Sequence, residues 1–211
     1  MAMWAFTGSK KLMEHFKDIV YNTFISMFKK HTRMYPIKPN DTTDLQEFMK
    51  VCLIDKEAQK LATTLREKYS KEWLDDYDLV VVDTLREVKR LLTYMSDVSI
   101  WAVPEYWQVP SETINKKTGD CEDGAILIVT LARINGIPAH RIFLSCGDVA
   151  YNKKKVGHAY VTYLGNDGAE YILDWCYFYD GRRIPTRKRN WYDDRYFMPR
   201  WFFGNDGGFY K

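Results

Sequence analysis

Residues 119–136 read GDCEDGAILIVTLARING, and this stretch sets the interpretation of the rest of the chain. Asp120 is a favourable helix N-cap, and the apolar run after it ends at Asn135-Gly136, a pair that commonly stops a helix in the left-handed conformation. We therefore expect a helix that begins at Asp120 and carries Cys121 in its first turn. Unpaired backbone N–H groups and the helix dipole favour negative charge there, which suits a nucleophilic thiolate.

Two further polar residues fall on the arms of an expected β-hairpin. Residues 158–164 and 169–175 have strand-like composition, and they flank the turn sequence GNDG at 165–168. A three-residue loop would place His158 directly opposite Asp174 on one face of the sheet. A cysteine, a histidine and an aspartate in this order suit a thiol nucleophile, its imidazole partner and the carboxylate that orients the imidazole.

Helices are expected to precede the strands along the chain. Helical spacing of apolar residues predicts helices over residues 9–30, from Thr43 or Asp44 to about residue 69, and over 77–95. The proline-containing stretch 96–117 is expected to be irregular, and residues 140–146 to form another strand.

This order of elements predicts an α+β fold in which the helix that carries Cys121 packs on an antiparallel sheet. We expect three parts. They are an N-terminal helical extension over residues 1–75, a catalytic core over 76–180, and an aromatic and basic tail over 181–211 that packs on the core.

Five short motifs around these residues resemble the core of the transglutaminase-like superfamily, with the best match in its bacterial transglutaminase-like cysteine proteinase branch. The motifs are WQVPSET at 107–113, GDCED at 119–123, NGIP at 135–138, GHA at 157–159 and ILD at 172–174. The resemblance covers roughly residues 77–180. It implies a papain-like α+β fold with Cys121 as nucleophile, His158 as base and acid, and Asp174 as the orienting residue.

The same resemblance implies a metal site and a cleft residue. In the proteinase branch, acidic residues beside the nucleophile bind calcium, and Asp120, Glu122 and Asp123 match those positions, with hard oxygen ligands that suit Ca²⁺. The alternative is a helix cap with first-turn carboxylates matched to the helix dipole. Trp107 matches an aromatic position that can line the site, although packing in the core or a loop is its simpler interpretation. The thiol chemistry itself requires no cofactor.

Composition excludes several other classes of protein. A net charge of +3 is too small to indicate nucleic-acid binding, and the short basic cluster at 182–189 adjoins Asp193 and Asp194, as on a solvated face. No run of 18 apolar residues could span a membrane, and the N-terminus lacks the features of a signal peptide, so we expect a cytoplasmic protein. The four cysteines contain no C-x-x-C pair and indicate neither a zinc nor a disulfide framework.

The sequence therefore predicts a thiol-dependent hydrolase, a cysteine peptidase or amidase, that acts on a protein or peptide substrate through an acyl-enzyme at Cys121. Two alternatives stay open. A lysine amine as the second acceptor would make the protein a transglutaminase or acyltransferase. If the geometry of Cys121, His158 and Asp174 does not allow catalysis, the protein would be an inactive binding or assembly module that keeps the fold.

Overall fold

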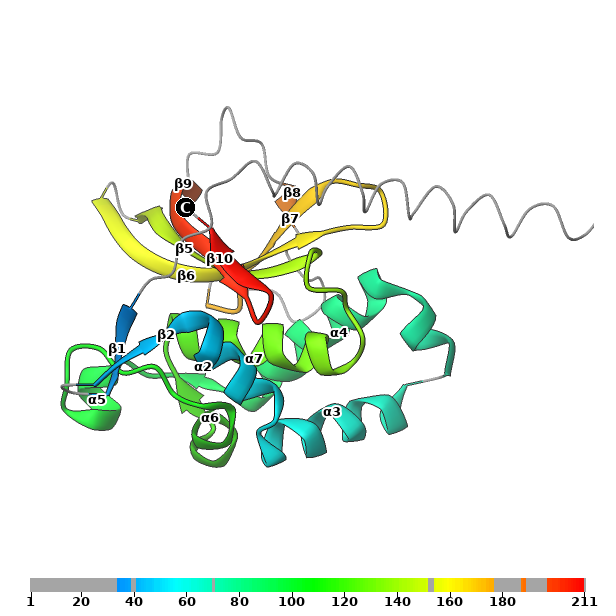
Figure 1. The fold of residues 1–211 in the computed structure, drawn as a ribbon, viewed down its shortest axis with the longest axis horizontal. Coiled ribbons are helices and arrows are strands. Elements are labelled where there is room, and N and C mark those ends of the chain that lie inside the picture. The colour runs from blue at the N-terminus through cyan, green and yellow to red at the C-terminus, as the bar shows by residue number, and fades with distance from the viewer. Residues whose placement is uncertain are drawn as a thin grey trace, which may run out of the picture.

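The structure, a computed structural model, describes residues 34–38, 41–69, 71–151, 154–176, 187–188 and 197–210. Within these residues a layer of helices packs against one face of an antiparallel sheet (Figure 1). Helix α7 (Cys121–Ile134) lies at the centre, where it contacts the sheet as well as the other helices. The helix predicted over residues 9–30 lies outside the described residues. The predicted α+β fold class is confirmed.

The helices that precede residue 96 depart from the sequence-based expectation in two places. A continuous helix from residue 44 to 69 is wrong, because Asp55 accepts hydrogen bonds from the backbone N–H groups of Glu57 and Ala58, at 3.0 Å each, and starts a new helix. The segment 77–95 is helical only to Leu91. The elements are α2 (Leu45–Leu53), α3 (Lys56–Lys68), the 3₁₀ helix η1 (Lys71–Asp75) and α4 (Tyr77–Leu91).

The prolines of the stretch 96–117 predict irregular structure, and this prediction is wrong. The stretch contains α5 (Asp97–Trp101) and α6 (Pro110–Lys116). Pro110 occupies the first helical position of α6, where its missing N–H costs nothing. Two short strands bracket the segment, because β3 (Thr93–Tyr94) pairs in parallel with β4 (Thr118–Gly119) immediately before α7.

The sheet has the strand order β10-β9-β5-β6-β7-β8 among the described residues, and all of its neighbours are antiparallel. A separate hairpin, β1 (Met34–Lys38) with β2 (Asp41–Asp44), precedes α2. The strands of the sheet are β5 (Ile142–Tyr151), β6 (Lys154–Leu164), β7 (Glu170–Leu173), β8 (Arg187–Lys188), β9 (Phe197–Asn205) and β10 (Gly208–Tyr210). Part of the C-terminal segment is thus built into the sheet beside β5.

The register of the predicted hairpin is wrong by two residues. Its loop has five residues, 165–169, and Leu164 pairs with Glu170, so the residue opposite Asp174 in this register is Tyr160. His158 comes two residues before Tyr160 in β6, further from the turn, and is a diagonal neighbour of Asp174. A shift of two keeps both residues on the same face of the sheet, because side chains alternate with a period of two.

The core surrounds α7, whose residues from Ala125 to Ala132 are almost fully buried on every side. A helix that is apolar on every side has to be buried against other elements on every side. The sheet covers α7 on one side, and α2, α3, α4 and α6 cover it elsewhere. Residues from α2 and α3 belong to the same hydrophobic cluster as α4, α7 and the sheet. No helix in the described part of the chain has the length and apolar character that crossing a membrane requires.

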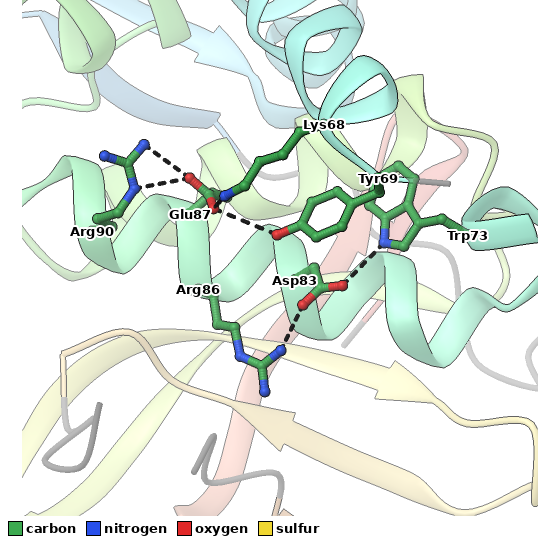
Figure 2. Close-up of polar contacts among 7 residues, drawn as sticks. All are labelled: Lys68, Tyr69, Trp73, Asp83, Arg86, Glu87 and Arg90. Atoms are coloured by element: carbon green, nitrogen blue, oxygen red, sulfur yellow. Dashed lines mark hydrogen bonds and ion pairs between the residues drawn. The ribbon is translucent and has the colours of Figure 1, made fainter. Parts of the chain in front are cut away.

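A polar network joins the end of α3 to α4 (Figure 2). Its centre is Glu87, a buried carboxylate that forms ion pairs with Lys68 and Arg90 and accepts a hydrogen bond from the hydroxyl of Tyr69 at 3.4 Å. One turn away, Asp83 accepts from Trp73 Nε1 at 3.2 Å and pairs with Arg86 at 2.7 Å. Lys68, Tyr69 and Trp73 contact these two carboxylates of α4 from outside the helix, so the network joins the end of α3 and η1 to α4.

Candidate active site

Cys121 is the first residue of α7, as predicted, and Asp120 is its N-cap. The Cys121 side chain is half-buried and lies in the wall of a cavity of about 360 Å³. Its backbone carbonyl accepts a hydrogen bond from the indole N–H of Trp175 at 3.2 Å. Trp175 follows Asp174 directly, so this bond ties the chain after β7 to the start of the helix.

His158 lines the same cavity as Cys121. Its Nε2 lies 2.7 Å from Oδ2 of Asp174, and both side chains are almost completely buried. The second carboxylate oxygen of Asp174, Oδ1, accepts a hydrogen bond from the backbone N–H of Cys176 at 2.9 Å. The partner of His158 across β5 is Gly147, which places no side chain beside the imidazole on that strand.

The electrostatic surroundings of Cys121 oppose its ionisation. Burial raises the pKa of the thiol well above its ordinary value, and the carboxylates of Glu122 and Asp120 raise it further. The backbone N–H of Ala159 acts in the opposite direction. The thiol also donates a hydrogen bond to Glu122 Oε2 at 3.1 Å, which is the arrangement of a protonated sulfur.

Five carboxylates converge beside the nucleophile, and we call them the acidic cluster: Asp97, Glu105, Asp120, Glu122 and Asp123. Overlapping groups of three offer oxygen atoms within 4.8 Å of one another. Burial raises the pKa of Asp97 to about 7, with a further contribution from Asp120. Burial also raises the pKa values of Asp120, Glu122 and Asp123.

Three oxygens of the acidic cluster are buried without a hydrogen-bond partner: Asp97 Oδ1, Asp120 Oδ1 and Glu122 Oε1. A buried acceptor without a donor is costly, and an ion is one way to satisfy it. Asp123 differs, because its oxygens accept from the backbone and side-chain N–H groups of Gln108 and from the backbone N–H of Asp120. The donor set of Asp97, Asp120 and Glu122 therefore fits a hard cation such as Ca²⁺, while Asp123 braces the helix start.

Trp107 combines the two roles considered for it. The side chain is buried and packs edge-on against Phe48, with ring centroids 6.4 Å apart, yet it also lines the cavity. Its indole N–H donates to Glu105 Oε1 at 2.8 Å. Glu112 braces the same loop, because it accepts from the backbone N–H of Val109 and from the hydroxyl of Tyr106.

The C-terminal strand contributes Trp201 to the cavity wall. Cys146 of β5 pairs with Phe202 and Gly147 pairs with Arg200, so Trp201 is the extra residue of a β-bulge. Bulges commonly redirect a side chain beside a functional site. The indole lies over Gly157, where an added Cβ would come within 2.8 Å of the ring.

Sequence reasoning placed Cys121, His158 and Asp174 in one site, with Trp107 as a candidate for its lining, and the structure brings all four to one cavity or its immediate border. Asp97, Glu105 and Trp201 were missed. Asp97 and Glu105 lie in the stretch expected to be irregular, and Trp201 lies in a strand that follows a long segment without recognisable motifs. None of the three has a spacing from Cys121 that would have indicated proximity.

Comparisons with known proteins identify the family. A profile described as the transglutaminase-like superfamily matches residues 71–179, just over half of the chain. The chain belongs to the transglutaminase-like superfamily. A search of curated protein sequences found no match.

Solved structures with a similar fold include LapG of Legionella pneumophila. An EGTA-treated form of LapG is 19% identical with a TM-score of 0.50, and the match covers 74% of this chain and 83% of that one. A calcium-bound form is 21% identical with a TM-score of 0.47, over 74% and 86% of the two chains. A candidate cysteine protease from Cytophaga hutchinsonii is 20% identical with a TM-score of 0.41, over 65% and 43%. The LapG match at a TM-score of 0.50 supports the fold.

Proposed function

We propose that the protein is a thiol-dependent hydrolase, a cysteine peptidase or amidase, in which Cys121, His158 and Asp174 act together. The observation that carries the proposal is the buried 2.7 Å contact between His158 Nε2 and Asp174 Oδ2 in the cavity that Cys121 also lines. Membership of the transglutaminase-like superfamily supports it. The substrate is a protein or peptide with an amide bond that fits the cavity.

The hydrogen bonds assign the proton on the imidazole. An ionised carboxylate only accepts, so the His158 nitrogen that faces Asp174, Nε2, carries the hydrogen. Nδ1 of the neutral ring then holds the lone pair, and it is the atom that takes the proton of Cys121. The thiolate attacks the amide carbonyl, and the imidazolium returns the proton to the leaving amine. Water then releases the acyl group from the sulfur.

The backbone at the start of α7 supplies donors for the oxyanion that forms in this step. The first N–H groups of a helix have no partner within the helix, and Cys121 stands at its first position. Such donors stabilise the negative oxygen of a tetrahedral intermediate more than they stabilise the substrate carbonyl. The Trp175 bond to the Cys121 carbonyl holds this turn in place.

Asp97, Asp120 and Glu122 would hold calcium in this proposal, because their unpartnered oxygens are buried beside the nucleophile. When bound, calcium supplies positive charge that offsets the carboxylates next to Cys121 and so favours the thiolate. The three carboxylates would position this charge beside the Cys121 sulfur. The chemistry at sulfur still belongs to Cys121 and His158.

A thiolate-directed activity probe tests the nucleophile. Wild-type protein should be labelled once, and the Cys121→Ala protein should lose that label while keeping its melting temperature. Equal labelling of the two proteins would show that the reactive thiol lies elsewhere. A cleavage screen of a peptide library, run with and without a primary amine such as cadaverine, distinguishes the outcomes. Cleavage indicates hydrolysis, amine incorporation indicates a transglutaminase, and neither indicates an inactive module.

Calcium is expected to stabilise the protein and activate its thiol. At about 100 times its Kd, a ligand of the folded state adds about 2.7 kcal/mol, which corresponds to roughly 5–10 °C in Tm for a chain of this size. The alkylation rate of Cys121 by iodoacetamide at pH 7 should rise with the same calcium dependence. Thermal melts and alkylation kinetics after EGTA treatment and calcium addition measure both effects.

The matched variants for the calcium experiment are Asp97→Asn and Asp75→Asn. The first keeps an oxygen for the backbone N–H of Tyr106 but removes a charge from the acidic cluster, while the second changes an exposed aspartate of η1. We expect Asp97→Asn to lose most of the calcium shift and Asp75→Asn to keep it. A wild-type protein that shows no shift would favour the helix-cap interpretation of the acidic residues.

A further inference from the structure

A third side chain lies beside the His158–Asp174 pair, and the proposed thiol chemistry does not use it. Cys176 is half-buried, and its backbone N–H donates to Asp174 Oδ1, which folds the chain back after β7. A His158 ring nitrogen, an Asp174 oxygen and the Cys176 sulfur all lie within 4.8 Å of one another. The sequence predicted His158 beside Asp174 but did not indicate Cys176, which the turn after β7 brings to the pair.

The donor set of this group differs from that of the acidic cluster. The cluster offers oxygens only, which suits calcium. The group of His158, Asp174 and Cys176 offers an imidazole, a carboxylate and a thiolate, the three kinds of ligand that Zn²⁺ takes in proteins. We propose that these three residues form a Zn²⁺ site whose occupation inhibits the enzyme.

The geometry of the group is close to what zinc requires. Tetrahedral zinc with bonds of about 2.0–2.3 Å separates its ligand atoms by roughly 3.3–3.6 Å. The 2.7 Å contact between His158 Nε2 and Asp174 Oδ2 has to open by less than about 1 Å, and the sulfur, which lies within 4.8 Å of the other ligand atoms, has to approach by at most about 1.5 Å. Two anionic ligands then balance the two charges of the ion, which limits the cost of burying it.

Zinc at this position stops the proposed reaction by a change of tautomer. When the metal occupies Nε2 of His158, the remaining ring hydrogen sits on Nδ1, and the imidazole can no longer accept the proton of Cys121. Asp174 is also withdrawn from its role as acceptor. The Cys176 thiol releases its proton to solvent as the S–Zn bond forms, because a coordinating thiol is deprotonated outright. The inhibition rests on the proposed function, whereas the metal site does not.

Metal binding is tested without any activity measurement. In the Cys121→Ala protein, with calcium present to saturate the acidic cluster, Co²⁺ should produce a thiolate-to-cobalt charge-transfer band that Zn²⁺ displaces. The band should be lost in Cys121→Ala/Cys176→Ser and strongly reduced in Cys121→Ala/His158→Ala. A band that persists in Cys121→Ala/Cys176→Ser, or no band in Cys121→Ala, would overturn the site.

Inhibition is tested with Cys176→Ser. The hydroxyl keeps the size of the side chain, and the backbone N–H that holds Asp174 is unchanged, so we expect ordinary hydrolysis without metal. The zinc concentration for half inhibition should rise at least tenfold relative to wild type. An unchanged zinc sensitivity would mean that zinc inhibits through Cys121 and His158 alone, and the proposal would be wrong. If neither protein hydrolyses any substrate, the cobalt band still decides the metal site.

Discussion

We expect the Asp174→Asn protein to lose roughly 10³- to 10⁴-fold in kcat while it keeps its fold. The readout is steady-state hydrolysis of a p-nitrophenyl ester, or of a peptide found in the cleavage screen, with thermal melts in parallel. Asparagine matches aspartate in size, and its oxygen can still accept from the Cys176 backbone N–H. The substitution therefore changes the contact to His158 and leaves the turn after β7 intact.

The loss follows from the proton on the imidazole. The amide nitrogen of the introduced asparagine would face His158 Nε2, and a donor can meet Nε2 only when that atom carries the lone pair. The hydrogen then moves to Nδ1, where it blocks transfer from Cys121. The imidazolium that forms in the transition state also loses its counter-charge across the 2.7 Å contact. Both effects raise the barrier without weakening substrate binding, so kcat should fall far more than KM changes.

The matched control for this experiment is Asp75→Asn, an equal change of charge at an exposed position of η1. Its rate should stay within a factor of about two of wild type, because surface substitutions away from a site have small effects. An Asp174→Asn protein with a wild-type rate and an unchanged pH–rate profile would show that Asp174 does not orient the imidazole. If Asp174→Asn greatly lowers the Tm, the rate of the Asp174→Glu protein, which keeps the carboxylate charge, is measured in its place.

Local patterns in the sequence predicted the parts of the site that depend on nearby residues. The N-cap at Asp120 and the position of Cys121 follow from capping chemistry within one turn, and α7 begins and ends within a residue or two of its expected limits. The turn signal at 165–168 predicted the hairpin. The register was not predicted, because the Gly165 N–H donates to the Ala169 carbonyl at 2.9 Å and the turn closes between these two residues, whereas the expected loop would have closed between Leu164 and Gly168.

The rest of the site depends on contacts between distant segments. Asp97 reaches the acidic cluster only because β3 pairs with β4 and brings the chain before α5 to the start of α7. Trp201 reaches the cavity through a bulge in β9, a strand far beyond Cys146 along the chain. Neither pairing has a local signal, since register and bulges are set by the packing of the assembled sheet.

The Gly124→Ala substitution is expected to be unusually damaging for the addition of one methyl group. An added Cβ would lie 2.2 Å from Trp175 Nε1 and 2.3 Å from Cε2, well inside van der Waals contact with the indole. Trp175 is almost fully buried, so the ring has no room to withdraw. Overpacking of this kind costs about 1–3 kcal/mol, and we expect Tm to fall by roughly 3–10 °C.

The same clash should also lower the rate of the proposed reaction. Trp175 is bonded to the Cys121 carbonyl and follows Asp174 directly, so displacement of the indole moves the carboxylate relative to His158. A shift of about 1 Å in a catalytic group can cost on the order of 100-fold in rate. We therefore expect Gly124→Ala to lower kcat at least tenfold at a temperature where the protein is still folded, as judged by circular dichroism.

A second substitution separates the clash from any intrinsic effect of alanine in the helix. Trp175→Leu removes the ring and is expected to be destabilising alone, because it leaves a cavity. In that background Gly124→Ala should be neutral or stabilising by up to about 1 kcal/mol, since alanine favours helix more than glycine does. The sign of the glycine-to-alanine effect thus reverses when the indole is absent. Equal destabilisation in both backgrounds would place the cause in α7 itself and would remove Trp175 as the link between the helix start and Asp174.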